Sequence, residues 1–383
     1  MGSVWEDMGM IEPRDEAELA EAVRGASGPL RIRGGGTRPV GGPVAGAVLS
    51  TAGLDGIVLY EPGALTLVAR AGTPLAEIEA ALVAEGQRLA FEPMDHRRLL
   101  GTDGVPTIGG VVAANVSGPR RVQAGACRDS LLGVRFVDGL GTVIKNGGRV
   151  MKNVTGYDLV KLMAGSYGTL GVVSEVSLKV LPAPDALASV TIAGLDDARA
   201  VAAMTRALGS PYEVSGAAHL PDAPGGPLTL MRVEGLAASV AYRAERLAAL
   251  LAGYGAVVDS DAAHARQVWA DLRDVVAFSG QAGDVWRLSV KPSDAPGLVA
   301  RMGARAVIYD WGGGLIWALM PEGVDLRAGL GNFSGHATLI RASEEVRARM
   351  PAFQPEPAPL AVLSEGLRAR FDPRGILNPG LMG

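Results

Sequence analysis

The sequence predicts an α+β protein built from two parts, and three observations lead to that prediction. The chain has 383 residues, which is too long for one ordinary hydrophobic core. Hydrophobic residues make up 48% of it and charged residues 20%, a balance typical of folded globular proteins. Two prolines in Leu181-Pro182-Ala183-Pro184 stop an alternating pattern, which indicates a domain boundary near residue 185.

The first part is expected to contain short strands and helices joined by loops. A helix over 15–24 is expected because Asp15 supplies an N-cap and Gly25 a stop. Thr73 before Pro74 is a typical helix start, with a hydroxyl cap and a proline in the first turn. Alternation of apolar with polar or small residues predicts the strands. In chain order, the elements after the first helix are a strand over 30–33, a helix from 75 that ends at Gly86, strands over 132–136 and 142–145, a short helix over 157–163 and a strand over 171–180.

The second part combines strands with alanine-rich helices and shows no long buried run typical of a parallel sheet. We therefore expect an α+β layer in which helices cover one side of a sheet. The expected strands span 189–193, 228–233, 256–260, 285–291, 306–309 and 315–320, and the clearest helices span 196–208, 237–252 and 262–273. A last helix over 360–371 leads into a turn-rich tail.

Composition and charge exclude several classes of protein. A net charge of −4 argues against a nucleic-acid surface, because phosphate binding needs a basic face. The single cysteine, Cys127, excludes a disulfide framework and an iron–sulfur cluster held by this chain alone. Residues 1–12 show no secretion signal, and no run approaches the ~18 apolar residues of a membrane span. We therefore expect a cytoplasmic protein with an inert thiol.

Residues 31–40, RIRGGGTRPV, place three glycines directly after a predicted strand. The segment lacks the third glycine of a dinucleotide-binding fingerprint, and Pro39 and Pro43 prevent the helix that this fingerprint opens. It also lacks the lysine of a P-loop. Two interpretations stay open at this point. One is a loop whose backbone N–H groups face a diphosphate, and the other is a surface turn.

Two further glycine-rich segments favour the first interpretation. Residues 104–121, GVPTIGGVVAANVSGPRR, contain small residues in series, which let a flat ligand lie against the backbone. Polar groups at Thr107, Asn115 and Ser117 can hydrogen-bond such a ligand. Residues 147–173, GGRVMKNVTGYDLVKLMAGSYGTLGVV, end in a loop that leads into a strand. Three separate loops of this kind are poorly explained as ordinary turns.

The order of these motifs resembles that of a known flavoprotein fold. RGGGT, PTIGG, SGPRR, LLGVRFVDG and MKNVTGYDLVKLMAGSYGTLGVVSEVSLKVLP follow one another as in the FAD-binding domain of the vanillyl-alcohol oxidase / p-cresol methylhydroxylase (PCMH-type) superfamily. WRLSVKPSDAP, IYDWGGGLIWAL, GHATLIRA and FDPRGILNPG resemble the smaller flavin subunit of bacterial glycolate oxidase. The resemblance implies a PCMH-type FAD-binding domain of two α+β subdomains over 1–185. It also implies an α+β cap over 186–345 and a segment over 346–383 that returns to the FAD domain.

The resemblance also implies which residues bind FAD. The first loop would cradle the diphosphate, and the second segment would line the diphosphate, ribityl chain and flavin. Gly171 and Val172 would lie near the adenine, and Asn378 near the flavin ring. The expected FAD-binding residues are Arg33, Gly34, Gly35, Gly36, Thr37, Arg38, Thr107, Gly109, Gly110, Asn115, Ser117, Gly118, Gly171, Val172 and Asn378. The loops lack the histidine and the cysteine that attach flavin covalently in this superfamily, so we expect non-covalent FAD.

The histidines limit how far the resemblance extends to catalysis. The catalytic glycolate oxidase subunit and related D-2-hydroxyacid dehydrogenases use an H-x-H pair, usually with a metal. The four histidines here, at 96, 219, 264 and 336, contain no such pair, so we expect no histidine metal site. His336 is the best candidate base for a 2-hydroxy acid, and Arg287, Lys291 and Arg341 are the best cations for its carboxylate. Each also has a structural interpretation, as a loop-packing histidine or as solvated or ion-paired cations.

The resemblance implies an FAD-dependent subunit of a complex that oxidises glycolate to glyoxylate. The expected partners are the catalytic flavin subunit, an iron–sulfur subunit that receives the electrons, and a small 2-hydroxy acid. Any contact with the inner face of a membrane is expected to be peripheral and to occur through those partners. Two alternatives stay open: a self-sufficient FAD-dependent 2-hydroxyacid dehydrogenase, and a non-catalytic scaffold that keeps the fold.

Overall fold

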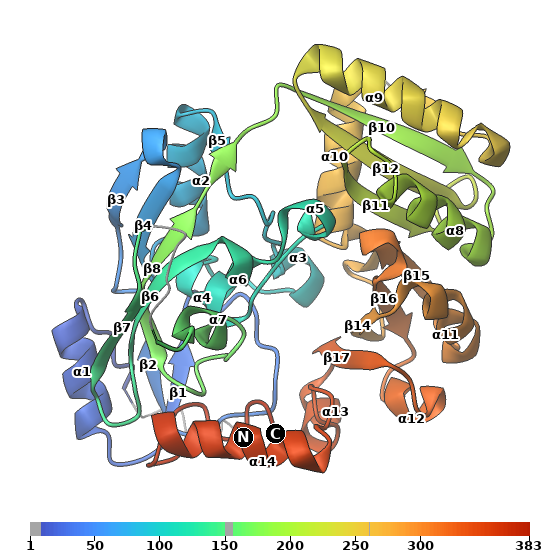
Figure 1. Cartoon of the computed structure of the whole chain (residues 1–383). Coiled ribbons are helices and arrows are strands. Elements are labelled where there is room, and N and C mark those ends of the chain that lie inside the picture. The colour runs from blue at the N-terminus through green and yellow to red at the C-terminus, as the bar shows by residue number, and fades with distance from the viewer. Residues whose placement is uncertain (1–8, 150–155, 260) are drawn as a thin grey trace.

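The computed structural model describes residues 9–149, 156–259 and 261–383, which form two layers (Figure 1). The first layer contains a five-stranded antiparallel sheet in the order β3-β4-β8-β6-β7 and a separate parallel pair, β1–β2. Its elements are α1 (Glu16–Gly25), β1 (Leu30–Arg33), β2 (Ala47–Ser50), β3 (Ile57–Glu61), β4 (Thr66–Arg70), α2 (Leu75–Ala84), β5 (Gln87–Arg88), α3 (Arg97–Leu100), α4 (Ile108–Ala113), α5 (Arg121–Ala124), α6 (Cys127–Ser130), β6 (Leu131–Val137), β7 (Val143–Gly147), α7 (Leu159–Met163), β8 (Val172–Lys179) and β9 (Leu181–Pro182).

The first turns of α1 and α2 test the helix caps predicted from the sequence. The Asp15 side chain accepts a hydrogen bond from the Glu18 N–H at 2.8 Å, which confirms the predicted cap of α1. The predicted cap of α2 is wrong, because Pro74 occupies the N-cap position and makes no side-chain cap bond. The Thr73 hydroxyl instead lies within hydrogen-bond distance of the carbonyls of Gly56 and Arg70. The Thr73 hydroxyl therefore binds the carbonyl of Gly56, which is distant in sequence, and does not cap α2.

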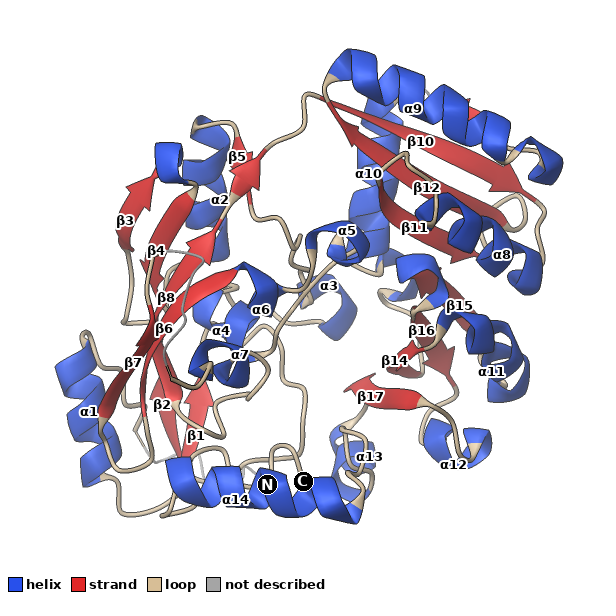
Figure 2. Ribbon diagram, in the orientation of Figure 1, coloured by secondary structure: helices blue, strands red, loops and turns tan. Residues whose placement is uncertain are grey.

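The second layer, which we call the cap layer, contains an eight-stranded antiparallel sheet in the order β13-β10-β12-β11-β15-β16-β14-β17 (Figure 2). Its elements are β10 (Ala186–Ala193), α8 (Asp197–Leu208), β11 (Val214–Leu220), β12 (Leu228–Gly235), α9 (Ala237–Leu250), β13 (Val257–Asp259), α10 (Ala262–Arg273), β14 (Asp284–Val290), α11 (Ala295–Met302), β15 (Ala306–Asp310), β16 (Leu315–Met320), α12 (Leu326–Leu330) and β17 (Gly335–Arg341).

Helices cover both faces of the cap sheet, so the expectation of one covered side is wrong. In β11, Ala217 packs in the cluster that holds α8 and α9, whereas its neighbour Ala218 packs in the cluster that holds Trp269 of α10. Successive residues of a strand point to opposite faces, so α10 lies opposite α8 and α9. Because both faces of β11 are buried, its sequence shows no alternation and was missed as a strand.

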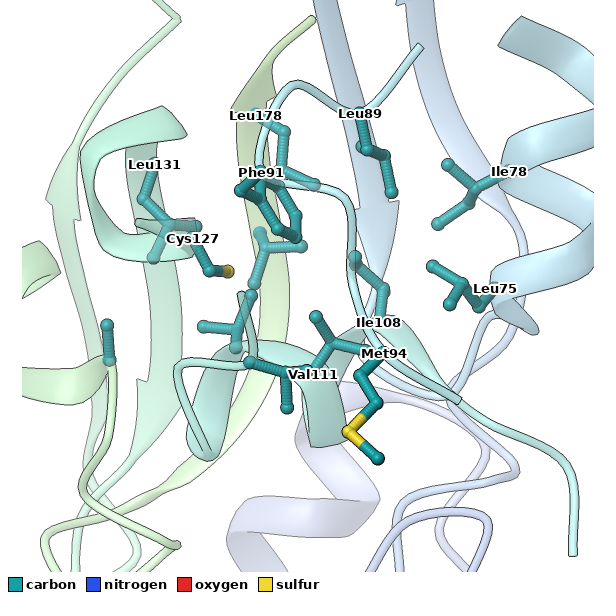
Figure 3. Packing of buried hydrophobic residues seen from close by; sticks show 14 of the residues in the cluster. Leu75, Ile78, Leu89, Phe91, Met94, Ile108, Val111, Cys127, Leu131 and Leu178 are labelled. Carbon is teal, nitrogen blue, oxygen red and sulfur yellow. The ribbon is translucent and has the colours of Figure 1, made fainter. Parts of the chain in front are cut away.

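The two layers share an apolar core. Leu75 of α2, Ile108 of α4 and Leu178 of β8 point into the part of this core drawn in Figure 3. The same cluster extends to Trp269 and Trp317 of the cap layer. The cap is therefore fixed against the first layer by hydrophobic packing, the largest favourable contribution to folding.

The C-terminal tail returns to the first layer. It contains α13 (Glu344–Arg349) and α14 (Ala358–Phe371), after which the Leu30 N–H donates to the Ile376 carbonyl at 2.7 Å. None of the residues of α14 is buried, and the side chains of Leu360, Val362 and Leu363 are more than half exposed. Within the described ranges, no helix has the length and apolar character needed to cross a membrane.

Candidate functional site

A cavity of about 870 Å³ opens between the glycine loop, α4, the loop before β8 and the C-terminal tail. This volume is within the range of pockets that hold cofactors and drug-sized ligands. Twelve of the residues predicted from the sequence line it. They are Arg33, Gly34, Gly35, Gly36, Thr37, Arg38, Thr107, Gly109, Gly110, Gly171, Val172 and Asn378. The tertiary structure therefore brings together four segments that are far apart in the sequence.

The glycines of the first loop permit a close approach between two backbones. A Cβ at Gly35 would lie 1.5 Å from the carbonyl oxygen of Val105, and one at Gly34 would lie 2.6 Å from the hydroxyl oxygen of Thr107. Gly36 adopts φ +72°, a left-handed conformation that disfavours other residues. Larger residues would force the loop away from the segment that precedes α4.

The loop also offers a row of free backbone donors. No N–H from Gly34 to Arg38 donates to a protein acceptor within the described residues. These five consecutive residues all line the cavity. Successive N–H groups that face one space form an anion-binding concavity, as in many phosphate sites.

Three predicted FAD-binding residues do not line the cavity. The Asn115 side chain accepts from the Arg128 N–H at 3.0 Å, and the Ser117 hydroxyl accepts from the Cys127 N–H at 3.0 Å. The Gly118 carbonyl accepts from the indole N–H of Trp311 at 3.0 Å. In the structure these residues join loops and layers. A small polar residue is equally suited to this role and to ligand binding, so the sequence could not separate the two.

Arg38 is positioned inside the cavity by two side chains. Its Nε donates to Nε2 of His96 at 3.1 Å, and its Nη2 donates to the Tyr167 hydroxyl at 3.0 Å. Burial lowers the pKa of His96 well below its usual value, and the charge of Arg38 lowers it further, so the imidazole is neutral and can accept this bond. Nη1 of Arg38 is buried and has no hydrogen-bond partner in the described part of the chain. This guanidinium therefore presents an unsatisfied donor.

Asn378 connects the tail to the cavity wall with both ends of its side chain. Its Oδ1 accepts from the Ile32 N–H at 2.8 Å, and its Nδ2 donates to the Tyr167 carbonyl at 2.8 Å. Its φ of +45° lies in the left-handed region, which asparagine tolerates better than most residues. Asn378 lines the site, and its amide is committed to holding β1 and the Tyr167 loop together.

The predicted catalytic pair lies on the cap face turned toward the first layer. Arg287 of β14 is paired in register with Trp317 of β16 and Thr338 of β17, so these three side chains share one face. His336 lies two residues before Thr338 and shares that face at an exposed position. Partial desolvation and then the charges of Arg287 and Arg121 lower the pKa of His336, which favours a neutral ring.

The other predicted cations are used elsewhere. Arg341 donates to the carbonyls of Leu99 at 3.2 Å and Phe278 at 2.8 Å, which makes it an inter-layer clamp. Lys291 is exposed beyond the end of β14. Sequence reasoning missed Asp310, a buried residue whose pKa burial raises to about 7. Asp310 directly follows a predicted strand, and nothing in the neighbouring sequence indicates that its carboxyl is buried.

A buried ion-pair network, which we call the inter-layer network, joins the two layers beside this face. Arg232 of β12 donates to both carboxylate oxygens of Glu92 at 3.0 and 2.9 Å. Arg120 donates to Glu234 at 2.9 and 2.7 Å, and Arg88 pairs with Glu234 at 3.2 Å. Burial by itself raises the pKa of both carboxyls, but the arginines outweigh it and hold both pKa values below their usual range.

The chain was compared with known proteins. It is 38% identical over 358 residues to the glycolate oxidase subunit GlcE of Escherichia coli K12, a match that covers 92% of this chain and 92% of that protein. The chain belongs to the GlcE family. A family profile described as an FAD binding domain matches its residues 9–147. The family resemblance and the FAD-binding domain predicted from the sequence are thereby confirmed.

More distant relatives share part of this GlcE-family chain. Glycolate oxidase subunit GlcD of Bacillus subtilis 168 is 32% identical over 182 residues, which are 46% of this chain and 37% of that protein. A D-lactate dehydrogenase of Anaerostipes hadrus is 32% identical over 189 residues, 48% of this chain and 38% of that protein. The solved structure of an alkyldihydroxyacetonephosphate synthase matches 97% of this chain and 76% of its own, with a TM-score of 0.69 at 16% identity. This last likeness shows the fold alone, and the α+β prediction is confirmed.

The cavity of this GlcE-family chain fits FAD. The free N–H groups from Gly34 to Arg38 suit a diphosphate, and the buried, unsatisfied Nη1 of Arg38 suits a ring carbonyl or an anionic oxygen. A Cβ at Gly109 would lie 2.7 Å from the Ala71 carbonyl oxygen, so glycine at this position allows α4 to pack closely against Ala71. The donor set and the volume therefore agree with the family assignment.

Proposed function

We propose that this chain is the FAD-carrying subunit of a complex that oxidises glycolate to glyoxylate. In this proposal a catalytic flavin subunit takes the electrons from glycolate, and this chain passes them toward an iron–sulfur subunit. The observation that carries the proposal is the match to GlcE over 92% of both chains. The absence of an H-x-H pair from the sequence supports the assignment of substrate oxidation to the partner.

The proposed domains follow from the position of the cavity. Residues 1–185 are proposed as the FAD-binding domain, 186–345 as the cap and 346–383 as the segment that completes the FAD site. Backbone N–H groups from Gly34 to Arg38 would hold the diphosphate, and the Arg38 guanidinium, oriented by His96 and Tyr167, would donate to the flavin end. Bound FAD supplies a two-electron acceptor.

The surface of α14 supports a subunit role. Its exposed apolar side chains, Leu360, Val362, Leu363 and Leu367, fall within eight residues of one helix. Contiguous exposed apolar patches mark sites of interaction with proteins or membranes. The printed name of the E. coli relative describes a subunit, which is consistent with such a contact.

A second candidate function is independent oxidation of a 2-hydroxy acid by this chain. The observation that favours it is the placement of Arg287 and His336 on one face of the cap. In that candidate the guanidinium would bind the substrate carboxylate, and the neutral imidazole would accept the hydroxyl proton.

Absorption spectra of the purified single chain, before and after anaerobic addition of glycolate, separate these functions. The proposal expects flavin absorption that glycolate leaves unchanged, and bleaching when the catalytic partner subunit is added. Bleaching by glycolate with this chain alone would support the second candidate and refute the relay. A colourless protein that cannot be reconstituted with FAD would support a scaffold and refute both.

A further inference from the structure

The Arg38 guanidinium is held by two acceptors that carry no charge. Its Nε donates to Nε2 of His96 at 3.1 Å, and its Nη2 donates to the Tyr167 hydroxyl at 3.0 Å. In the described part of the chain no carboxylate pairs with Arg38, whereas Arg232 of the inter-layer network pairs with Glu92 at 2.9 Å. The structure thus orients the positive charge of Arg38 without neutralising it.

His96 is suited to this role because its ring is neutral. An arginine side chain can only donate, so Nε2 of His96 accepts this bond and the ring proton lies on Nδ1. Burial lowers the pKa of His96 well below its usual value, and the charge of Arg38 lowers it further. The charge of Arg287 acts in the same direction, and a hydrogen bond with the Met94 backbone acts against it. A neutral acceptor fixes the direction of the guanidinium and leaves its charge in place.

The second acceptor lies where the cavity meets the cap layer. The Tyr167 ring packs edge-on against Phe353, with 4.8 Å between the ring centres. Phe353 in turn packs against the core shared by the two layers and against the cluster that holds α8 and α9. Arg287 of the cap is close enough to Arg38 for the two charges to repel each other. The Arg38 side chain therefore lies at the cap-facing side of the cavity.

The third nitrogen of the guanidinium is a buried donor without an acceptor. Nη1 of Arg38 makes no hydrogen bond to the described residues, and the side chain lines the cavity. A buried donor left unpaired is unfavourable, so a bound group that supplies an acceptor there is stabilised. The backbone N–H groups from Gly34 to Arg38 already suit the diphosphate of FAD. The guanidinium is therefore available to the flavin ring, the part of FAD whose charge changes during electron transfer.

We propose that Arg38, held by His96 and Tyr167, sets the reduction potential of the flavin in this subunit. Uptake of two electrons and one proton converts the neutral oxidised ring into a reduced ring with one negative charge. A fixed positive charge beside the ring stabilises the reduced form and raises the potential. His96 is a positioning residue, since it acts on the flavin only through Arg38.

This role of Arg38 rests on the proposed function in one respect, the presence of FAD in the cavity, and adds a direction to the relay. A higher potential favours the flow of electrons from the flavin of the catalytic partner into this subunit. Glycolate bleaching of the single chain would refute the relay, but it would leave the effect of Arg38 on the potential unchanged. The two failures are therefore distinguishable.

Reductive titration of the FAD-loaded chain against dyes of known potential measures the effect. Arg38→Gln is expected to weaken binding of reduced FAD at least tenfold relative to oxidised FAD, which lowers the two-electron midpoint potential by about 30 mV or more. Arg38→Lys is expected to give a smaller shift, because the ammonium keeps the charge but not the planar fork. Arg246→Gln is the matched control, because Arg246 stacks on Tyr242 at 5.3 Å on the exposed surface of α9. It is expected to keep the potential of the unmodified chain.

Variants of the two acceptors separate positioning from packing. His96→Leu removes an acceptor and is expected to shift the potential in the same direction as Arg38→Gln. His96→Gln keeps an acceptor and is expected to recover most of the potential of the unmodified chain. Tyr167→Phe keeps the ring that packs against Phe353 and is also expected to lower the potential, since only the hydroxyl is lost.

An unchanged potential in Arg38→Gln, with oxidised and reduced FAD weakened equally, would assign Arg38 to the diphosphate and overturn the proposal. An unchanged potential in His96→Leu would overturn the positioning role. If Arg38→Gln does not retain FAD, Arg38→Lys and His96→Leu still decide. An unmodified chain that cannot be loaded with FAD would refute this role together with the proposed function.

Discussion

Gly35→Ala tests whether the close approach of two loops builds the FAD site. The added Cβ would lie 1.5 Å from the Val105 carbonyl oxygen and 2.5 Å from its carbonyl carbon. Non-bonded carbon and oxygen atoms approach to about 3.3 Å. One loop must therefore move by roughly 1.8 Å, and both colliding atoms belong to backbone that no side-chain rotation can clear. Overpacking of this kind costs about 1–3 kcal/mol, which lowers Tm by roughly 1–4 °C in a chain of this length.

The same displacement turns the N–H groups of residues 34–38 away from a common centre, so FAD affinity is expected to fall at least tenfold. The assay is the flavin-to-protein ratio of the purified variant, followed by titration with FAD and calorimetric measurement of Tm. Gly28→Ala is the matched control, because its Cβ would meet nothing within 4 Å. A Gly35→Ala protein with unchanged flavin content and Tm would refute the reasoning.

Three further predictions follow from the described contacts. Glu234→Gln leaves Arg88 without a carboxylate and leaves Arg120 and Arg232 with Glu92 alone. It is expected to cost about 3–5 kcal/mol of unfolding free energy in calorimetry; a loss under 1 kcal/mol would contradict this value. Because the folded pKa of Glu234 is lowered from 4.5, its contribution is complete above about pH 5.5 and is lost as the pH falls below 4.5 toward the folded pKa, so the unmodified chain should lose more Tm between pH 5.5 and pH 3 than the variant does. Cys127 is expected to resist a thiol reagent in the native protein and react after unfolding, because burial raises its pKa and covers it; fast native labelling would contradict this. Replacing Val362 and Leu363 together with serine is expected to leave Tm and flavin content unchanged and to weaken co-purification with partner subunits; undiminished co-purification would remove α14 from the contact.

The sequence located much of the cavity because its residues carry a backbone requirement. Gly35 is needed where two backbones approach and Gly36 where φ is positive, and glycine is the residue that meets both conditions. These backbone requirements can be predicted from a single sequence segment without knowledge of its neighbours in the fold. Asn115 and Ser117 illustrate the limit, because a small polar residue serves a ligand or a loop equally well and only its partners decide.

The tryptophans show the same limit: residue type favours their burial, but only the structure gives their partners. Trp286 is fully buried in the cap. Trp317 faces the first layer, and Trp311 holds two arginines at that interface. The sequence favours burial of all three by residue type, since aromatic side chains gain most from leaving water. It gave no sign that Arg121, from a separate segment, would stack on Trp311.

By itself, the sequence determined the α+β class, the longest helices, many of the strands, the family and the glycine loops, because each depends on local periodicity, turn chemistry or motif order. Only the tertiary structure decided which charges are neutralised. Arg120 and Arg121 are adjacent in sequence and equal in chemistry, yet Arg120 pairs with Glu234 while Arg121 stacks on Trp311 without an acid. The physical reason is that electrostatic energy depends on distance and burial, and both are set by residues more than a hundred positions away.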